Sequence, residues 1–305
     1  MVARVAKPRW CRQKIGRGLM KILVIGKGGQ VATELALLPD TESVGRDRAD
    51  LTDPEACAAV ILNSDCDAVI NAAAYTAVDK AEEEEALAVL INAEAPGAMA
   101  RACAQKNIPF IHISTDYVFA GEGTTAFCPE DPTGPLGAYG RTKLAGEEKI
   151  KQAGGSFAII RTSWVVSSHG NNFIKTMLRL GQSRDALSIV GDQIGGPTPA
   201  AALAKATWMV AQCLITSPEK SGIYHLSGTP DTSWADFAKE IFRQAELTVA
   251  VTDIPTRDYP TPAKRPGNSR MNCDSIKAQF NIDRPDWRAD LTHILNALKK
   301  QELIT

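Results

Sequence analysis

Short β-branched runs alternate with longer helical patterns along the chain from Lys21. The runs ILVIG, AVINAA, PFIHIS and FAIIRT occupy residues 22–26, 68–73, 109–114 and 157–162. The helical patterns between them occupy residues 30–38, 85–107 and 139–154. Strands that alternate with helices form βαβ units, and continuous apolar runs fit strands that are buried on both faces. This alternation predicts an α/β fold built on a Rossmann-type, doubly wound parallel sheet.

The regular alternation loosens after residue 163. Gly-Pro and Pro-rich stretches appear at residues 191–199 and 253–269, and long loops on a compact enzyme usually line a site. We therefore expect a Rossmann domain over residues 20–163. Residues 164–305 should form mainly a smaller C-terminal α/β region that binds the substrate, with some segments returning to the Rossmann sheet.

The first 19 residues, MVARVAKPRWCRQKIGRGL, hold six Lys or Arg and no acidic residue. They contain no apolar core of signal-peptide length. We interpret residues 1–19 as a disordered, basic N-terminal extension. A transit peptide and a nucleic-acid-binding arm are alternatives, but a second start at Met20, directly before the first strand, favours an upstream start codon.

Composition limits the class of protein. The chain of 305 residues carries a formal net charge of −1, which gives no overall attraction to nucleic acid or to an anionic membrane. No apolar run reaches the ~18 residues that indicate a transmembrane helix. The seven cysteines are scattered without a C-x-x-C pair and the four histidines lie far apart, which fits reduced thiols and no metal site. We expect a cytoplasmic protein with no nucleic-acid or membrane partner.

Three glycines lie between the first predicted strand and the first predicted helix, in ILVIGKGGQVATEL. Gly26, Gly29 and Ala32 have the spacing G-x-x-G-x-x-A. Glycine lets the backbone turn tightly and approach a pyrophosphate, and a small third residue lets helix and strand pack closely. Many turns contain glycine, but the place of this one favours a dinucleotide site. Residues 20–163 are therefore predicted to bind NAD(P).

Residues 45–53, which follow a short strand expected after the first helix, bear on the choice of cofactor. An acid there binds the ribose 2′-hydroxyl of NAD, and an arginine accommodates the 2′-phosphate of NADP. Arg46 and Arg48 lie in this region, in GRDRADLTD. They favour NADPH and leave NADH open, because loop arginines without a ligand would give the same pattern.

The stretch AYGRTK places Tyr139 four residues before Lys143. Positions i and i+4 of a helix share a face, so the phenol and the ammonium can reach one small molecule. A positive charge nearby lowers the pKa of a tyrosine and makes it a better general acid. Taken alone, such a pair is more often an ordinary surface contact.

Polar residues also end the strand PFIHIS, where Thr115 and Asp116 follow Ser114. One interpretation is an ST-turn at a strand end. The functional interpretation places Thr115 beside Tyr139, where its hydroxyl stabilises the negative charge that develops on a substrate carbonyl oxygen. The glycine turn, the strand-end hydroxyl and the Y-x-x-x-K pair occur together in a consistent order, which favours the functional interpretation.

Taken together, these motifs resemble the extended short-chain dehydrogenase/reductases and, more narrowly, the dTDP-4-dehydrorhamnose reductase family. The matching stretches are GKGGQV, VINAAAYTAVDKAE, STDYVFAG, YGRTKLAGE, RTSWV, NNFIKTMLRL and YPTPAKRPGNSRMN. They run from about Met20 to about residue 290. NAAAYTAVDKAE and RPGNSRMN are the most specific, whereas the Tyr–Lys pair is shared by the whole superfamily.

The resemblance implies catalytic and cofactor-binding roles. Tyr139 protonates the alkoxide oxygen as hydride arrives, and Thr115 holds the substrate oxygen. Lys143 binds the nicotinamide ribose and lowers the pKa of Tyr139. With these two helix residues, the expected cofactor contacts are Gly26, Gly29, Gln30, Val31, Arg46, Asp50, Leu51, Ala74, Tyr75 and Thr76.

The resemblance also implies substrate contacts. Thr115 and Asp116 contact the sugar, Trp164 lines the substrate site, and Arg265 is a candidate for the diphosphate, because arginine and phosphate often pair in a bidentate way. Core packing is the alternative for Trp164.

Three positions depart from the family pattern. Ala32 stands where a glycine is common and Gly28 where a threonine is frequent, but both residues are small. Some members carry a glutamate at the position of Ala201, where it helps to bind magnesium at a dimer contact. Alanine cannot ligate a metal, so the sequence leaves Mg²⁺ open and argues against that kind of homodimer. A homodimer of another kind stays open.

The expected activity is the NAD(P)H-dependent reduction of the 4-keto group of dTDP-4-dehydro-L-rhamnose to dTDP-L-rhamnose, the last step of dTDP-rhamnose biosynthesis. One alternative is another nucleotide-sugar reductase or an epimerase of the same superfamily. A second is a non-catalytic regulatory subunit with this fold, since fold does not fix function. The complete set of Thr115, Tyr139 and Lys143 argues against a regulatory subunit, which has no chemical need of it.

Overall fold

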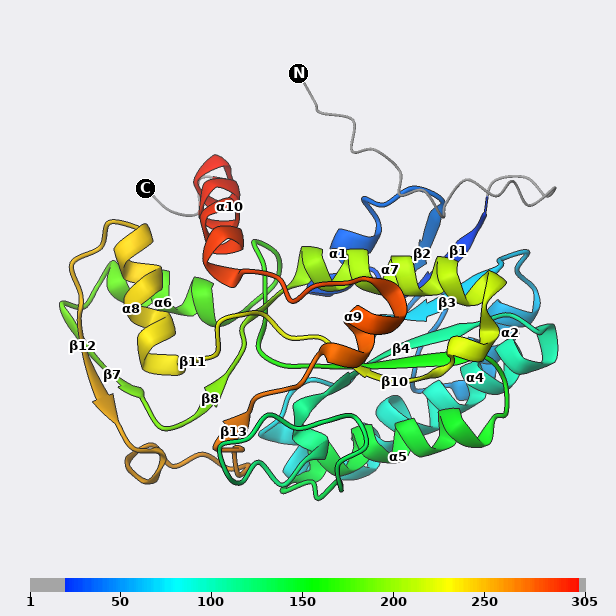
Figure 1. Ribbon diagram of the computed structural model, residues 1–305, viewed down its shortest axis with the longest axis horizontal. Coiled ribbons are helices and arrows are strands. Elements are labelled where there is room, and N and C mark those ends of the chain that lie inside the picture. Colours follow the sequence, from blue (N-terminus) through cyan, green and yellow to red (C-terminus); the bar gives the residue numbers. More distant parts are fainter. Residues whose placement is uncertain (1–19, 302–305) are drawn as a thin grey trace.

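The computed structural model describes residues 20–301 and has a parallel sheet at its centre (Figure 1). The six strands lie in the order β10-β5-β4-β3-β1-β2, and every neighbouring pair is parallel. They are β1 (Ile22–Ile25), β2 (Thr41–Val44), β3 (Ala68–Asn71), β4 (Phe110–Thr115), β5 (Phe157–Thr162) and β10 (Gly222–His225). All residues of β1 and β3 are buried, as apolar strands covered on both faces require. The predicted Rossmann-type α/β fold is confirmed.

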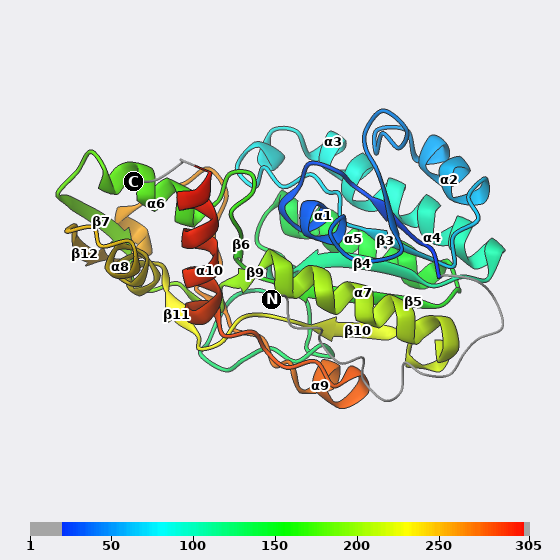
Figure 2. The same ribbon diagram turned by 90° about the horizontal axis from the view of Figure 1, so that it is seen from above.

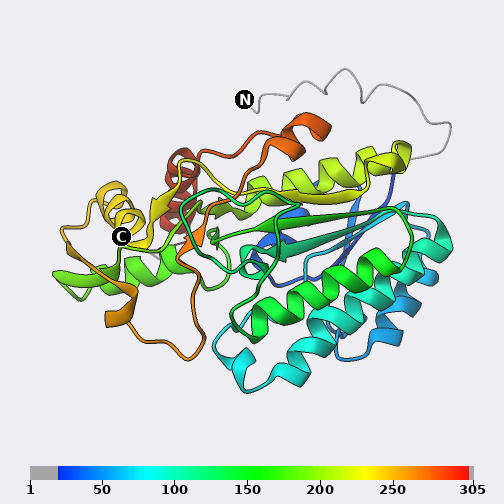
Figure 3. The ribbon, with the colours of Figure 1, turned by 60° about the horizontal axis from the view of Figure 1, so that its bottom comes forward.

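Helices cover both faces of the sheet (Figure 3). One face packs on α1 (Gln30–Leu35), α7 (Ala200–Thr216) and α9 (Asp274–Phe280), and the other packs on α2 (Pro54–Leu62), α4 (Ala95–Lys106) and α5 (Ala138–Gln152). Successive side chains of a strand point to opposite faces. Accordingly, Ile22 and Val24 belong to the first hydrophobic core, and Leu23 and Ile25 belong to the second.

The helix predicted over residues 85–107 is interrupted. It consists of α3 (Glu85–Val89), a π-helical segment (Leu90–Glu94) and α4. Pro96 lies at the start of α4 and has no N–H to donate into a continuous helix. The π-helical segment turns Asn92 inward, where its amide bonds both backbone groups of Tyr75 at 2.9 and 3.1 Å.

The C-terminal part forms a second, smaller layer of short strands and helices beside the carboxyl ends of the main sheet (Figure 2). Its strands are β6 (Val165–Val166), β7 (Ala186–Val190), β8 (Ile194–Gly195), β9 (Thr198–Pro199), β11 (Thr232–Ser233), β12 (Ala250–Ile254) and β13 (Asn268–Ser269). Its helices are α6 (Phe173–Gly181), α8 (Trp234–Gln244) and α10 (Trp287–Lys300), which share a third hydrophobic core. Short 3₁₀ turns lie at Lys80–Glu82, Asp116–Val118, Pro218–Lys220 and Thr256–Asp258.

The two stretches predicted as long loops are partly ordered into strands. Residues 191–199 contain β8 and β9, and residues 253–269 contain β13. Within residues 164–301, the elements α7, β10 and α9 pack on the main sheet. The predicted extension at residues 1–19 lies outside the described residues, and the division near residue 163 stays a prediction. None of the helices within residues 20–301 has the length and apolar character needed to cross a membrane.

Candidate active site

The carboxyl ends of the parallel strands open into a cleft of about 870 Å³. The glycine turn after β1, the ends of β3 and β4, and the first turns of α5 form one part of its wall. Trp164, Val165 and Trp234 from the C-terminal part form another. A crevice at this edge of an open α/β sheet is where such folds bind ligands.

The glycine turn brings the backbone close to the neighbouring strand. Gly26 has a φ of +123°, which a residue with a side chain rarely adopts. A Cβ at Gly26 would lie 3.3 Å from backbone atoms of Ala72 and Ala73 and 3.4 Å from the Cβ of Ala32. Gly29 caps α1 without a side-chain bond, so the turn exposes bare backbone to the cleft. The turn fits a pyrophosphate because Gly28 and Gly29 line the cleft and place no side chain between the backbone and a ligand.

One of the two candidate arginines reaches the cleft. Arg46 lines it and forms an ion pair with Asp50, with Nε 2.9 Å from the carboxylate. The backbone N–H of Thr52 and the Arg46 side chain lower the pKa of Asp50 to about 2. Arg48 instead pairs with Glu42 at 2.8 Å and does not line the cleft. Of the two arginines, only Arg46 therefore lies where it can contact a cofactor in the cleft.

Tyr139 and Thr115 line the same cleft from two different elements. Tyr139 lies in the first turn of α5, and Thr115 ends β4. The Thr115 hydroxyl accepts the N–H of Tyr117 at 3.2 Å and donates to Asp116 at 3.0 Å. The residue therefore makes an ST-turn and also faces the cleft, so the two interpretations of the strand end are compatible.

Burial controls the proton affinities of the phenol and of the neighbouring carboxyl. Burial raises the pKa of Tyr139 to about 12, with the Thr115 hydroxyl acting in the opposite direction and Asp116 adding to the rise. Burial also raises the pKa of Asp116 to about 6. Its Oδ2 has no hydrogen-bond partner among residues 20–301.

Lys143 is turned toward the sheet. Its Nζ lies 2.7 Å from the carbonyl oxygen of Ile113 and 3.0 Å from Nε2 of His112, whose Nδ1 is 3.1 Å from the Asn71 amide. Burial lowers the pKa of Lys143 to about 8, against the opposing effect of Glu147. The expectation that Lys143 lowers the pKa of Tyr139 is not met in this arrangement, because the ammonium contacts His112 and Ile113 and the burial of the phenol dominates.

A buried ion pair lies beneath this site. Glu147 of α5 receives hydrogen bonds from Arg161 of β5 at 2.7 and 3.0 Å and from the Ser114 hydroxyl of β4 at 2.5 Å. Arg161 also donates to the carbonyl of Pro129 at 3.0 Å. The pair holds α5 against both strands and so fixes the helix that carries Tyr139 and Lys143.

All but two of the predicted site residues line the cleft. Those that do are Gly26, Gly29, Gln30, Val31, Arg46, Asp50, Leu51, Ala74, Thr76, Thr115, Asp116, Tyr139, Lys143 and Trp164. Tyr75 and Arg265 are not among the lining residues. The Tyr75 hydroxyl donates to Glu84 at 2.5 Å, and Arg265 pairs with Asp79 at 2.7 Å.

Several lining residues were not predicted, among them Lys27, Ser163, Asn171 and Trp234. Trp234 stacks on Trp164 with ring centroids 3.6 Å apart and an angle of 14° between the planes. Trp234 is the first residue of an amphipathic helix, where a tryptophan has the sequence pattern of a core residue, and no sequence motif distinguishes it.

Comparison with known proteins identifies the family. The family model for the RmlD substrate binding domain matches residues 20–300. A dTDP-4-dehydrorhamnose reductase of Sinorhizobium fredii (strain NBRC 101917 / NGR234) is 42% identical over 289 residues, which cover 92% of this chain and 98% of the relative. The chain belongs to this reductase family. A relative of the same name from Escherichia coli (strain K12) is 41% identical over 293 residues, with 92% and 98% covered.

Solved structures agree with this assignment. The fold is similar to a dTDP-4-dehydrorhamnose reductase from Clostridium acetobutylicum ATCC 824, with a TM-score of 0.85, 36% identity, and 92% and 100% of the two chains covered. A reductase from Bacillus anthracis str. Ames, solved in complex with NADP, gives a TM-score of 0.84 at 34% identity, with 91% and 99% covered. A UDP-glucose 4-epimerase gives 0.74 at 16% identity, which shows a shared fold alone.

Proposed function

We propose that the chain reduces the 4-keto group of dTDP-4-dehydro-L-rhamnose to dTDP-L-rhamnose with NADPH, the last step of dTDP-rhamnose biosynthesis. The observation that carries the proposal is the meeting of Thr115, Tyr139 and Lys143 in one cleft with a glycine turn. Membership of the reductase family supports the substrate and the reaction, because the match to relatives of this name covers 98% of their length.

The residues present fit a nicotinamide dinucleotide. Gly26 lets the turn pack closely against Ala72 and Ala73, and Gly28 and Gly29 line the cleft without a side chain, which suits the close approach of a pyrophosphate. Arg46 supplies a cation near the end of β2, which favours NADPH over NADH. A relative from Bacillus anthracis was solved in complex with NADP, which supports the same preference here.

When bound, the nicotinamide cofactor supplies the hydride. Thr115 is proposed to donate a hydrogen bond to the keto oxygen and to stabilise the charge that develops on it, which requires its one hydroxyl proton to leave Asp116 for that oxygen. Tyr139 gives its proton to that oxygen as the alkoxide forms. With a pKa near or above the ordinary value of about 10, the phenol is protonated at neutral pH and can donate. The rise to about 12 on burial makes Tyr139 a weaker acid than a free phenol.

Other cleft residues position the substrate and cofactor. Lys143 is proposed to hold the nicotinamide ribose, with the N–H that its contacts to Ile113 and His112 leave over or by exchange of one of them. Asp116, whose pKa is about 6, accepts a hydrogen bond from the sugar when it is ionised at neutral pH. Trp164 covers the sugar nucleotide. Arg265 is proposed to bind the diphosphate, which requires its guanidinium to exchange Asp79 for phosphate oxygens. Tyr75 remains a proposed contact. Its hydroxyl bonds Glu84 and its backbone N–H and carbonyl bond the Asn92 amide, so contact with a ligand requires one of these bonds to be exchanged.

Loss of NADPH absorbance on addition of dTDP-4-dehydro-L-rhamnose tests the function. The UDP analogue and NADH serve as parallel substrates, and NMR of the product identifies the sugar. Stoichiometric formation of dTDP-L-rhamnose supports the proposal. Protein that is purified with tightly held NAD and consumes no net NADPH is an epimerase instead. A cytoplasmic location, a homodimer and the role of Mg²⁺ stay open predictions.

A further inference from the structure

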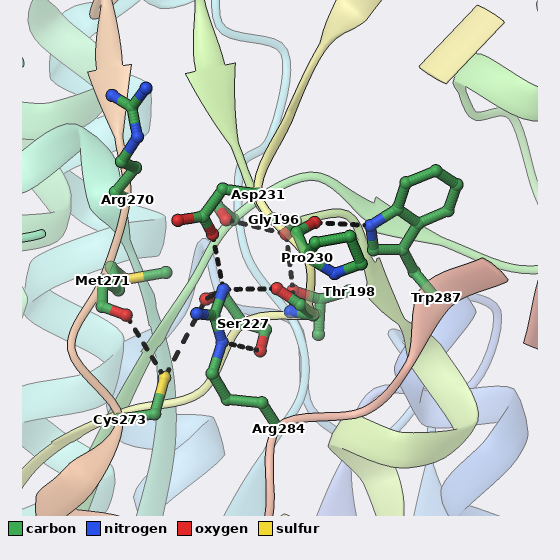
Figure 4. Close-up of polar contacts among 12 residues, drawn as sticks. Gly196, Thr198, Ser227, Pro230, Asp231, Arg270, Met271, Cys273, Arg284 and Trp287 are labelled. Atoms are coloured by element: carbon green, nitrogen blue, oxygen red, sulfur yellow. Dashed lines mark hydrogen bonds and ion pairs between the residues drawn. The ribbon is translucent and has the colours of Figure 1, made fainter. Parts of the chain in front are cut away.

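Arg284 lies outside the cleft and bonds the segment of residues 227–231, which leads into β11 and Trp234 (Figure 4). We propose that Arg284 is a positioning residue for Trp164 and Trp234, and through them for the part of the cleft that takes the sugar nucleotide. The kinetic consequence rests on the proposed function, whereas the geometry of the indole pair does not.

The guanidinium of Arg284 bonds three residues of the segment that follows β10, and we call these contacts the clasp. Its Nη2 lies 2.5 Å from the Gly228 carbonyl, 2.5 Å from the Asp231 carboxylate and 3.3 Å from the Ser227 hydroxyl. Its Nε donates to the Ser227 carbonyl at 3.2 Å. Arg284 itself lies in the linker between α9 and α10. Two nitrogens of one planar guanidinium serve these acceptors, whereas a lysine would have to serve them from a single ammonium.

One path leads from the clasp to Trp164. The N–H of Gly228 donates to the Thr198 hydroxyl at 3.3 Å, which donates to the Gly196 carbonyl at 3.2 Å. The N–H of Thr198 donates to the carbonyl of Trp164 at 3.0 Å. The contact is tight, since a Cβ at Gly196 would lie 2.1 Å from the Gly228 carbonyl oxygen. Movement at residue 228 therefore reaches the backbone of Trp164.

A second path leads from the clasp to Trp234. Asp231 immediately precedes β11, and Trp234 immediately follows it. β11 pairs with β8, which contains Gly195. The Trp164 indole fills the space between these elements, because a Cβ at Gly195 would lie 3.0 Å from its Cε2 and Trp234 stacks on its ring. Both indoles are thus linked, through β9 and β11, to the residues that Arg284 bonds, which are Ser227, Gly228 and Asp231.

The backbone of Trp164 makes this support necessary. Its φ of +50° is in the left-handed region, which residues other than glycine occupy only where the surroundings hold them there. A separate bond, from Nε1 of Trp287 to the Pro230 carbonyl at 2.6 Å, still anchors the 227–231 segment when Arg284 is changed. Loss of the clasp should therefore loosen the indole pair and leave the chain folded.

The test compares Arg284→Lys and Arg284→Met with Arg243→Lys. The control makes the same arginine-to-lysine change in an arginine–carboxylate pair of similar length, 2.7 Å to Glu240, on the exposed surface of α8. Circular dichroism reports the exciton band of two stacked indoles, and Trp234→Phe identifies its source. Steady-state kinetics report KM for the sugar nucleotide and for NADPH separately.

For both Arg284 variants we expect a weakened exciton band and a KM for the sugar nucleotide raised on the order of tenfold to a hundredfold. The KM for NADPH and the far-ultraviolet spectrum should stay as in the control. An unchanged band, an equal rise in both KM values, or unfolding of both Arg284 variants would overturn the proposal. If the wild-type protein reduces no dTDP sugar, the proposed function fails, and the exciton band still decides the role of Arg284.

Discussion

Replacement of Glu147 by glutamine tests whether the buried ion pair holds the catalytic helix in place. The side chains of Glu147 and Arg161 are 0% and 3% exposed, and their closest contact is 2.7 Å. Glutamine keeps the size of the side chain and removes the charge. The Arg161 guanidinium then stays buried with only neutral acceptors, since it lies inside the sheet layer and cannot reach solvent.

The magnitude follows from this burial. Loss of one partner of a buried pair costs about 3–5 kcal/mol of folding free energy, because the other charge is left uncompensated. The matched control is Glu85→Gln, which breaks the bidentate pair with Arg141 at 2.9 and 3.0 Å. That pair is roughly half exposed, 46% and 43%, so its loss should cost about 0–1 kcal/mol.

Urea unfolding followed by circular dichroism measures both changes. Glu147→Gln should lower the unfolding midpoint far more than Glu85→Gln, with the same slope for both. In the double variant Glu147→Gln/Arg161→Met, part of the loss should return, because no charge is left buried. A midpoint for Glu147→Gln equal to that of Glu85→Gln would refute the structural role of the pair.

Three further predictions concern the cofactor and pH. Gly26→Ala should weaken NADPH binding in calorimetry, because its Cβ would lie 3.3 Å from the backbone of the next strand; unchanged affinity would argue against the glycine turn. Arg46→Ala should raise KM for NADPH and leave KM for NADH unchanged, and an equal effect on both would contradict its contact with the 2′-phosphate. The third concerns histidines: burial lowers the pKa of His112 well below 6.5 and that of His225 to about 3. Below pH 6.5 these histidines bind protons in the unfolded chain and not in the folded one, so the free energy of unfolding decreases as the pH is lowered. The slope is about 1.4 kcal/mol per pH unit for each histidine. Below pH 6, Asp116 binds a proton in the folded chain, because its folded pKa is about 6, and this offsets the effect of one of the two histidines. Urea midpoints between pH 7 and pH 5 that stay constant would contradict this.

The strands β1, β3, β4 and β5 could be predicted because most of their residues are apolar, whereas the edge strands β2 (TESV) and β10 (GIYH) give no such run. A buried parallel strand contacts helices on both faces, so its residues show a continuous run that few other elements give. The cleft could be predicted for a related reason, since a glycine turn and the ends of β3 and β4 must meet at one edge of such a sheet.

The partners of long side chains could not be predicted from the sequence. Lys143 bonds His112 because α5 packs with this side chain against β4, and no spacing in the sequence reports that rotation. Arg265 pairs with Asp79, a residue far away in the chain. Trp234 reaches the cleft through strand pairing between β8 and β11, which are two residues each and too short to give an alternating pattern.

The most direct test of the whole account is turnover of dTDP-4-dehydro-L-rhamnose and NADPH by the wild-type protein and by Tyr139→Phe. The account predicts rapid NADPH consumption by the wild-type protein, and a turnover lower by about a hundredfold or more for Tyr139→Phe with NADPH binding retained. Near-normal turnover by Tyr139→Phe would contradict the role of the phenol as the proton donor. No turnover by folded wild-type protein that binds NADPH would contradict the proposed reaction itself.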